Sequence, residues 1–185
     1  MPHVRTSAVV LAAWLACLPA AATAQSSGEY DVKAAYLYNF AKFVEWPAQS
    51  FPSPDAPFAI CVLGQDPFGR ALDDIVRDER VQGRPLVVRR LKGWDDAELC
   101  HILFVSTSEQ DDFTQLLGGH TFRRTLTVGE VPQFLAAGGH ISFFREGSSI
   151  RFAVSEANVA RTDMQISSKL MRVARVERGR GGGTQ

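Results

Sequence analysis

Apolar and polar positions alternate along the chain in blocks that predict strands and helices in turn. Two short runs, Phe58–Leu63 and His101–Ser106, are almost wholly apolar, which is typical of strands buried on both faces of a sheet. Arg84–Leu91 and Thr125–Val128 predict two further strands. Because helical segments separate these strands, the order predicts an α/β domain with parallel pairing.

The helical segments are marked by capping residues and breakers. Asp66 is placed as an N-cap with Pro67 as the first helical residue, and Ser106 with Glu109 has the spacing of a capping box. The expected helices are Tyr30–Trp46, Pro67 to about Arg77, Asp95–Leu99, the segment after Ser106 to about Leu117, Val131–Ala137 and Ser167–Val176.

The last two strands form a hairpin. His140–Phe144 and Ile150–Val154 flank the turn-forming segment Arg145–Ser149. The fold class predicted is therefore a three-layer α/β/α sandwich with a mixed, mostly parallel sheet and a C-terminal β-hairpin. Residues 25–176 are expected to form a single domain, and the Gly- and Arg-rich residues 177–185 a disordered tail.

The helix expected at Tyr30–Trp46 has an unusually wide apolar arc. At 100° per residue Asp31, Lys42 and Glu45 share one polar stripe with Asn39 at its edge. Lys33 falls within the apolar arc, where we expect its ammonium to reach water near the helix start. Two interpretations remain open: a deeply buried packing helix, or a helix that also meets a partner.

The first 24 residues have the three parts of a secretory signal. A basic start with Arg5 precedes an apolar run, Ala8–Leu18, and Ala22–Ala24 supplies the small residues of a cleavage site. The apolar run is too short for a transmembrane helix. Lipidation at Cys17 is the alternative, disfavoured by the bulky Trp14 three residues earlier. We therefore expect export to the periplasm.

Cleavage removes 24 of the 185 residues and leaves 161, a length that suits one hydrophobic core. It also leaves 19 basic against 20 acidic residues, so no basic excess indicates a nucleic-acid partner. Two cysteines remain, Cys61 and Cys100, and an even pair in an exported protein indicates a disulfide. Two buried free thiols are the alternative, and two isolated cysteines cannot complete a metal site.

No pattern of catalytic residues stands out. The three remaining histidines lack zinc-ligand spacing, and neither a nucleophile elbow nor a phosphate-binding loop is present. Ser106 and Ser108 follow a strand, but helix capping accounts for both hydroxyls. The adjacent acids Asp73 and Asp74 diverge on a helix and do not converge on one substrate atom. We expect no enzyme activity, no metal and no cofactor.

Binding is the better hypothesis, and two regions are candidates. A ligand loop is expected at Gly64, Asp66, Phe68 and Gly69, because strand ends that meet helix starts often hold ligands. A tight turn that needs Gly64 for its backbone is the alternative. Arg89, Arg90 and His140 are candidates for an anion site if the fold brings them together. A partner surface is expected at Lys33, Asn39, Lys42, Arg145 and Glu146, although a hairpin tip is often only a solvated turn.

Residues 30–47, with the sequence YDVKAAYLYNFAKFVEWP, resemble the opening motif of the YfiR family of bacterial periplasmic proteins. Further matches follow in the same order over essentially the whole mature chain. They are Ile60–Gly64, Asp66–Gly69, Gly83–Pro85, Cys100–Ser106, Leu126–Gly129 and Ile166–Leu170.

The resemblance implies a periplasmic regulator with an α/β/α sandwich fold. Such proteins repress an inner-membrane diguanylate cyclase by binding its periplasmic domain, and so control cyclic di-GMP and biofilm or exopolysaccharide output. An outer-membrane peptidoglycan-binding lipoprotein sequesters the repressor, and homodimers are expected. Cys61 and Cys100 match the family's shared disulfide positions, while the second cysteine pair of some members is missing here. The alternative function is a periplasmic sensor domain for a small ligand.

Overall fold

The computed structural model describes residues 22–120 and 122–178. Most of the expected signal peptide, residues 1–21, therefore lies outside the described residues, as does most of the expected tail. Residues 22–24 form the start of helix α1 (Ala22–Phe43), which begins eight residues before the expected start at Tyr30. No helix in the described part of the chain is both long and apolar enough to cross a membrane.

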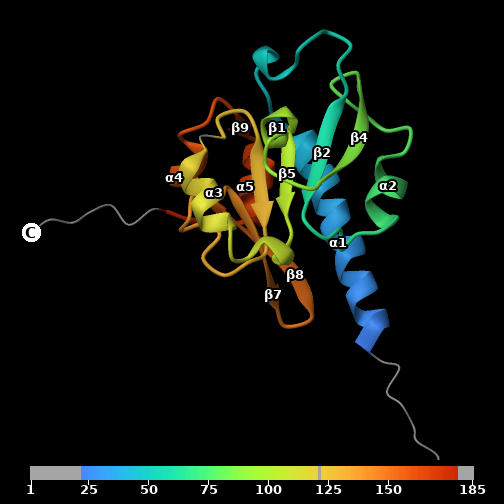
Figure 1. The fold of residues 1–185 in the computed structure, drawn as a ribbon, viewed down its shortest axis with the longest axis vertical. Coiled ribbons are helices and arrows are strands. Elements are labelled where there is room, and N and C mark those ends of the chain that lie inside the picture. The colour runs from blue at the N-terminus through green and yellow to red at the C-terminus, as the bar shows by residue number, and fades with distance from the viewer. Residues whose placement is uncertain (1–21, 121, 179–185) are drawn as a thin grey trace, which may run out of the picture.

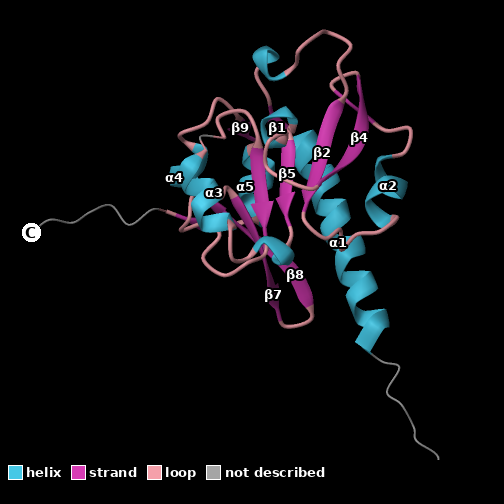
Figure 2. Cartoon of the chain, in the orientation of Figure 1, coloured by secondary structure: helices cyan, strands magenta, loops and turns pink. Residues whose placement is uncertain are grey.

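The core element is a curled eight-stranded sheet with the order β10-β8-β7-β6-β5-β2-β4-β3 (Figures 1 and 2). Five of its neighbouring pairs are parallel, and only β7–β8 and β3–β4 are antiparallel. The expected mixed, mostly parallel sheet is confirmed. The strands are β2 (Phe58–Leu63), β3 (Arg80–Val81), β4 (Arg84–Leu91), β5 (Ile102–Val105), β6 (Leu126–Gly129), β7 (Ile141–Glu146), β8 (Ser149–Ser155) and β10 (Arg175–Glu177).

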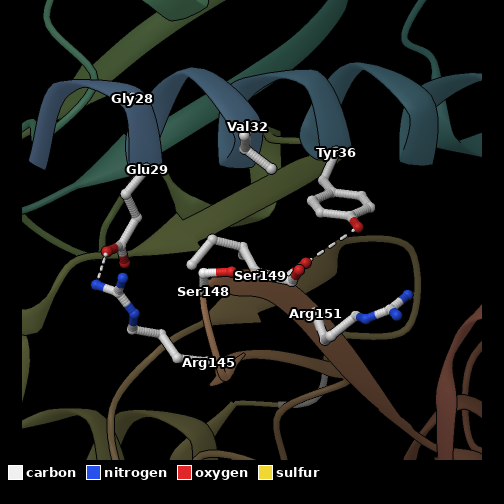
Figure 3. A pocket seen from close by; sticks show the side chains of 9 residues that line it. Gly28, Glu29, Val32, Tyr36, Arg145, Ser148, Ser149 and Arg151 are labelled. Atoms are coloured by element: carbon white, nitrogen blue, oxygen red, sulfur yellow. Dashed lines mark hydrogen bonds and ion pairs between the residues drawn. The ribbon is translucent and has the colours of Figure 1, made fainter. Parts of the chain in front are cut away.

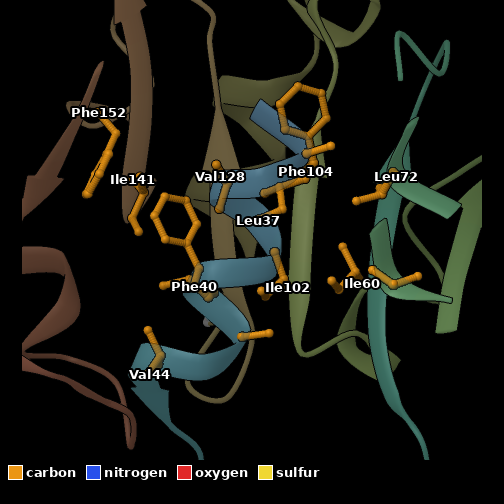
Figure 4. Close-up of a cluster of buried hydrophobic side chains, with 14 of the residues drawn as sticks. Leu37, Phe40, Val44, Ile60, Leu72, Ile102, Phe104, Val128, Ile141 and Phe152 are labelled. Carbon is orange, nitrogen blue, oxygen red and sulfur yellow. The ribbon is translucent and has the colours of Figure 1, made fainter. Parts of the chain in front are cut away.

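Two apolar layers cover the faces of this sheet. On one face α1, α2 (Ala71–Val76) and α5 (Ser168–Val173) pack through side chains that include Leu37, Phe40 and Leu72 (Figure 4). On the other face α3 (Phe113–Gly119) contributes Phe113 and Leu117. The remaining short helices are α4 (Glu156–Val159) and the 3-10 turns η1 (Ala48–Ser50), η2 (Ala97–Leu99) and η3 (Thr107–Glu109).

Strand β2 consists of an unbroken apolar run because both of its faces are buried. Ile60 and Val62 point into the layer beneath α1, whereas Ala59 and Leu63 point into the layer beneath α3. All six residues of β2 are buried, because each face of a central parallel strand is covered. Cys61 lies on the α3 side and forms the expected disulfide with Cys100, with 5.9 Å between their Cα atoms.

The structure corrects several expected boundaries. Helix α1 ends at Phe43, not Trp46, because Val44 and Glu45 form strand β1 (Val44–Glu45), which pairs with β9 (Gln165–Ile166). The prediction of a helix at Val131–Ala137 is wrong, because the segment is a series of turns. Gln133 in this segment adopts a left-handed φ of 64°, which no regular right-handed helix accommodates.

Three other helices also differ from expectation. Asp66 caps a local turn by accepting from the Phe68 amide, so α2 begins only at Ala71. The segment expected as Asp95–Leu99 is reduced to the 3-10 turn η2. The last helix ends at Val173, since the chain then pairs with β8 as the short strand β10.

The C-terminal hairpin is confirmed. Strands β7 and β8 pair antiparallel from Ile141 with Val154 to Glu146 with Ser149, which leaves a two-residue turn. Gly147 occupies that turn with a φ of 61°, a conformation that glycine adopts without steric cost. The hairpin extends beyond the body of the sheet and lies beside the first turns of α1 (Figure 1).

Candidate functional site

A cavity lies between α1 and the tip of the β7–β8 hairpin (Figure 3). It has a volume of about 550 Å³, and it is open to solvent on one side. Helix α1 contributes Glu29, Val32 and Tyr36, while the hairpin contributes Arg145 and Arg151. We refer to this space as the helix–hairpin cleft.

Ion pairs beside the cleft join three elements. Lys33 on α1 contacts the carboxylates of both Glu29 and Glu130, and Arg145 Nη1 lies 2.9 Å from Glu29 Oε2. Glu130 directly follows β6, so the cluster ties α1 to the carboxyl edge of the sheet and to the hairpin. A second cavity of about 300 Å³ lies against the same residues.

We expected the Lys33 ammonium to reach water, and this prediction is wrong. The residue is only 3 % exposed, because two carboxylates neutralise its ammonium inside the protein. Tyr30 completes the cluster by donating a hydrogen bond of 2.8 Å to Glu130 Oε1. Burial raises the pKa of the Tyr30 phenol above its ordinary value, and the neighbouring carboxylate of Glu130 raises it further.

Tyr36 ties the middle of α1 to the hairpin. Its hydroxyl donates to the backbone carbonyl of Ile150 at 3.2 Å, and its ring packs against Phe143 and Phe152. Helix α1 therefore holds the hairpin in place through both charged and aromatic contacts. Val32, which is 43 % exposed, leaves an apolar side chain between these two sets of contacts.

The expected partner-surface residues fall into two groups. Lys33 and Arg145 meet through Glu29, and Glu146 follows Arg145 at the exposed hairpin tip. Lys42 and Asn39 lie farther along α1, and neither lines the cleft. Lys42 is exposed and lies over the ring of Tyr38, with 4.9 Å between its Nζ and the ring centroid.

The hairpin tip carries more positive than negative charge. Glu146 lies between two guanidinium groups, with 2.8 Å to Arg175 Nη2 and 3.6 Å to Arg151 Nε. One carboxylate therefore faces two arginines at an exposed position, and each contact is partly screened by water. The hairpin therefore contributes Arg145 and Arg151 to the cleft, and each lies near a carboxylate.

The expected ligand loop makes its contacts within the protein. Asp66 accepts from the Phe68 amide and from Arg90 Nε at 2.9 Å, and the Gly69 carbonyl accepts from Arg90 Nη2 at 3.0 Å. Gly64 has a φ of 84°, and a Cβ added there would lie 2.2 Å from Ser108 Oγ. Position 64 therefore needs a glycine, as the tight-turn interpretation expected. Phe68 is buried in the core.

Arg89, Arg90 and His140 are not brought together. Arg90 is held by Asp66 and by Asp73, whose pKa is lowered mainly by the hydrogen bonds from Arg90. His140 lies beyond three other strands, where its Nδ1 accepts from the Thr127 amide at 3.0 Å. Burial lowers the pKa of His140 to about 4, so its ring is neutral and does not attract an anion.

Residues considered for catalysis have structural partners. Ser106 Oγ caps η3 by accepting from the Ser108 amide, as the capping interpretation expected. Within the described residues, no group of three or more histidine, cysteine, aspartate or glutamate side chains is placed to hold a metal ion.

Sequence reasoning missed Glu29, Glu130, Tyr36 and Arg151. One available signal was the position of Glu130 immediately after a buried strand, where polar residues gather at the carboxyl edge of a parallel sheet. Glu29 gave no such signal, because its contact with Arg145 joins residues 116 positions apart.

The sequence profile of the YfiR/HmsC-like family matches residues 30–175. The match begins at Tyr30 in the charged cluster and ends at Arg175, the first residue of β10, so it includes the whole sheet up to that strand. No curated protein sequence matches the chain.

Proposed function

Because the chain belongs to the YfiR/HmsC-like family of periplasmic regulatory proteins, we propose that it represses an inner-membrane diguanylate cyclase by binding the cyclase's periplasmic domain. The observation that carries this proposal is the family match over nearly the entire folded domain. Repression lowers cyclic di-GMP and with it biofilm and exopolysaccharide output. The protein acts by binding and not by catalysis.

The export signal and the disulfide support this location. The expected cleavage site lies just before Gln25, and the Cys61–Cys100 bond is stable only where thiols are not kept reduced. A protein released into the periplasm reaches the outer face of the inner membrane. It also reaches an outer-membrane peptidoglycan-binding lipoprotein, which we propose as the sequestering partner.

We propose the helix–hairpin cleft and the adjoining face of α1 as the surface that meets the cyclase. The ion pair between Arg145 and Glu29 joins its two walls, and Lys33 pairs with the same glutamate. Glu146 lies at the rim, and Asn39 and Lys42 extend the surface along α1. Val32 supplies an exposed apolar contact beside basic Arg145 and Arg151. Apolar anchors with a charged rim are typical of protein interfaces. The repressor is expected to act as a homodimer.

A genetic epistasis experiment tests this function. Deleting the gene for this protein should raise cyclic di-GMP, and deleting the cyclase gene as well should return it to the starting level. Deleting the lipoprotein gene alone should lower it, because more repressor is then free. An unchanged cyclic di-GMP level after the first deletion contradicts the proposal.

A further inference from the structure

Strand β4 lies near the end of the eight-stranded sheet that is remote from the hairpin, and only β3 lies beyond it in the strand order (Figure 2). Strand β3 is two residues long, and it pairs only with Arg84 and Pro85 at the start of β4. One further bond covers this side, from the Leu86 amide to the Glu79 carbonyl at 3.2 Å. Residues 87–91 therefore have a neighbouring strand on one side only, and we refer to their unpaired side as the open edge of β4.

The hydrogen bonds already made show which backbone groups of β4 point outward. The Leu91 carbonyl faces β2, because it accepts from the Gly64 amide at 3.3 Å. Successive residues of a strand direct their N–H and C=O groups to opposite sides. Counting back from Leu91, the groups of Arg90 and Val88 therefore point away from β2. The outward Leu86 amide follows the same alternation.

These outward groups are available for pairing. The N–H and C=O groups of Val88 and Arg90 on this side have no hydrogen-bond partner among the described residues. Arg90 is exposed and Val88 is half-buried, so the edge reaches the surface of the molecule. Unpaired N–H and C=O groups along a strand are a template on which another extended chain can pair. Strand β3 protects this edge only at the start of β4.

The arginines of β4 disfavour pairing with a second copy of the same edge. Two symmetric antiparallel registers leave β3 in place. In one, Val88 pairs with Arg90 of the second copy, which puts Arg89 directly opposite its own counterpart. In the other, Arg90 lies opposite its counterpart, and each brings the two carboxylates of Asp66 and Asp73. Like charges directly opposite each other destabilise a strand pair, so the edge favours a different partner.

The side chains along the open edge indicate what that partner carries. Val87, Arg89 and Leu91 share the face of the sheet that α3 covers, because side chains alternate along a strand. Arg89 is exposed and makes no hydrogen bond or ion pair within the described part of the chain, and Glu98, which lines a cavity with it, forms no ion pair with it. A carboxylate opposite Arg89, with apolar residues opposite half-buried Val87 and Leu91, completes three favourable cross-strand pairs.

We propose that the open edge of β4 binds an extended segment of another protein as an added antiparallel strand. The backbone of the segment pairs with Val88 and Arg90. Its carboxylate faces Arg89, and the apolar side chains next to it on the same face lie against Val87 and Leu91. The inference does not depend on the proposed repressor function, because β2, β5 and β6 separate β4 from the hairpin.

The probe is the blocked peptide acetyl-Thr-Val-Thr-Glu-Thr-Val-Thr-amide, titrated into ¹⁵N-labelled protein purified from the periplasm. NMR follows the backbone amide signals of Val88 and Arg90, and both should shift saturably. A peptide with lysine in place of glutamate should bind about fivefold more weakly, because its cross-strand pair with Arg89 is repulsive. A peptide N-methylated at the threonines on either side of the glutamate should bind at least about tenfold more weakly, because those amides donate to the edge.

Charge reversal separates binding at this edge from weak association elsewhere. Arg89→Glu should reverse the preference, so that the lysine peptide binds more tightly than the glutamate peptide. Arg172→Glu, an exposed change on α5, should leave the preference as it is. The proposal is overturned if Val88 and Arg90 show no saturable shift, if the N-methylated peptide binds equally well, or if Arg89→Glu does not alter the preference. It is also overturned if dilution of the protein alone moves the same signals, because that result indicates pairing of two copies.

Discussion

Glu29 in the first helix and Arg145 in strand β7 form an ion pair across 116 residues of sequence, with 2.9 Å between Oε2 and Nη1. The same glutamate also contacts Lys33, which in turn contacts Glu130. Two carboxylates and two cations thus join the helix, the hairpin and the end of β6. Glu29 and Arg145 of this cluster line the helix–hairpin cleft, so a partner bound there would contact them.

Replacing Lys33 with Met should strongly destabilise the fold. The change leaves Glu29 and Glu130 in a buried site without their shared cation, and breaking a buried pair typically costs about 3–5 kcal/mol. Urea unfolding measures the loss. Lys42→Met on the same helix is the matched control, since Lys42 is exposed and should change stability by less than about 0.5 kcal/mol. Equal effects of the two changes would show that the buried cluster contributes no stability.

Reversing the charge of Arg145 should weaken partner binding more than it weakens the fold. Arg145→Glu removes a positive charge from the cleft wall and places two carboxylates side by side at Glu29. We expect the affinity for the cyclase domain to fall about tenfold or more, while the exposed ion pair accounts for at most about 1 kcal/mol of stability. Arg172→Glu on α5 is the control.

Calorimetric titration of both variants checks this, with circular dichroism to confirm folding. If Arg145→Glu and Arg172→Glu bind the domain alike, the helix–hairpin cleft is not the contact surface, even where the parent protein binds normally.

Removing the Cys61–Cys100 disulfide should lower the free energy of unfolding by several kcal/mol. Cys61 and Cys100 are 39 positions apart, and closing a loop of this length stabilises by about 4 kcal/mol in the chain-entropy model. The double change Cys61→Ser with Cys100→Ser avoids leaving one reactive thiol. Urea midpoints measured with and without dithiothreitol should differ for the parent protein and coincide for the double variant. Identical midpoints for the parent under both conditions would contradict a stabilising bond.

Stability should fall as the pH drops below about 6.5. Burial lowers the folded-state pKa values of His101 and His140 to about 4, whereas unfolded histidine titrates near 6.5. The unfolded chain therefore gains protons first, so stability is complete above pH 6.5 and is lost towards pH 4. Each histidine should contribute a loss of roughly 2 kcal/mol between pH 7.5 and 5.

Urea unfolding at several pH values measures this slope. Arg172→Gln on α5 is the control, because it is an exposed change that leaves every histidine in place and should leave the slope unchanged. If the free energy of unfolding of the parent protein does not change between pH 7.5 and 5, burial does not lower the folded-state pKa values of the two histidines.

The central strands were predictable because their signal is local. Every residue of β2 and of β5 is buried, so the sequence of each strand is a continuous apolar run bounded by polar residues. The hairpin was predictable for a related reason, since Gly147 and two serines separate two alternating segments.

The features that escaped prediction depend on distant contacts. Strand β10 has no apolar pattern of its own and exists because Arg175–Glu177 pairs with β8. Lys33 is buried because Glu130, 97 residues away, neutralises it, and the helical periodicity of α1 carries no information about that residue.

The most direct measurement is a calorimetric titration of this protein with the purified periplasmic domain of the inner-membrane diguanylate cyclase from the same cell. We expect saturable binding at a defined stoichiometry, and we expect Arg145→Glu to weaken it. No detectable heat or co-purification, with both proteins folded and with the disulfide either intact or reduced, would contradict the claim that this protein is the cyclase's repressor.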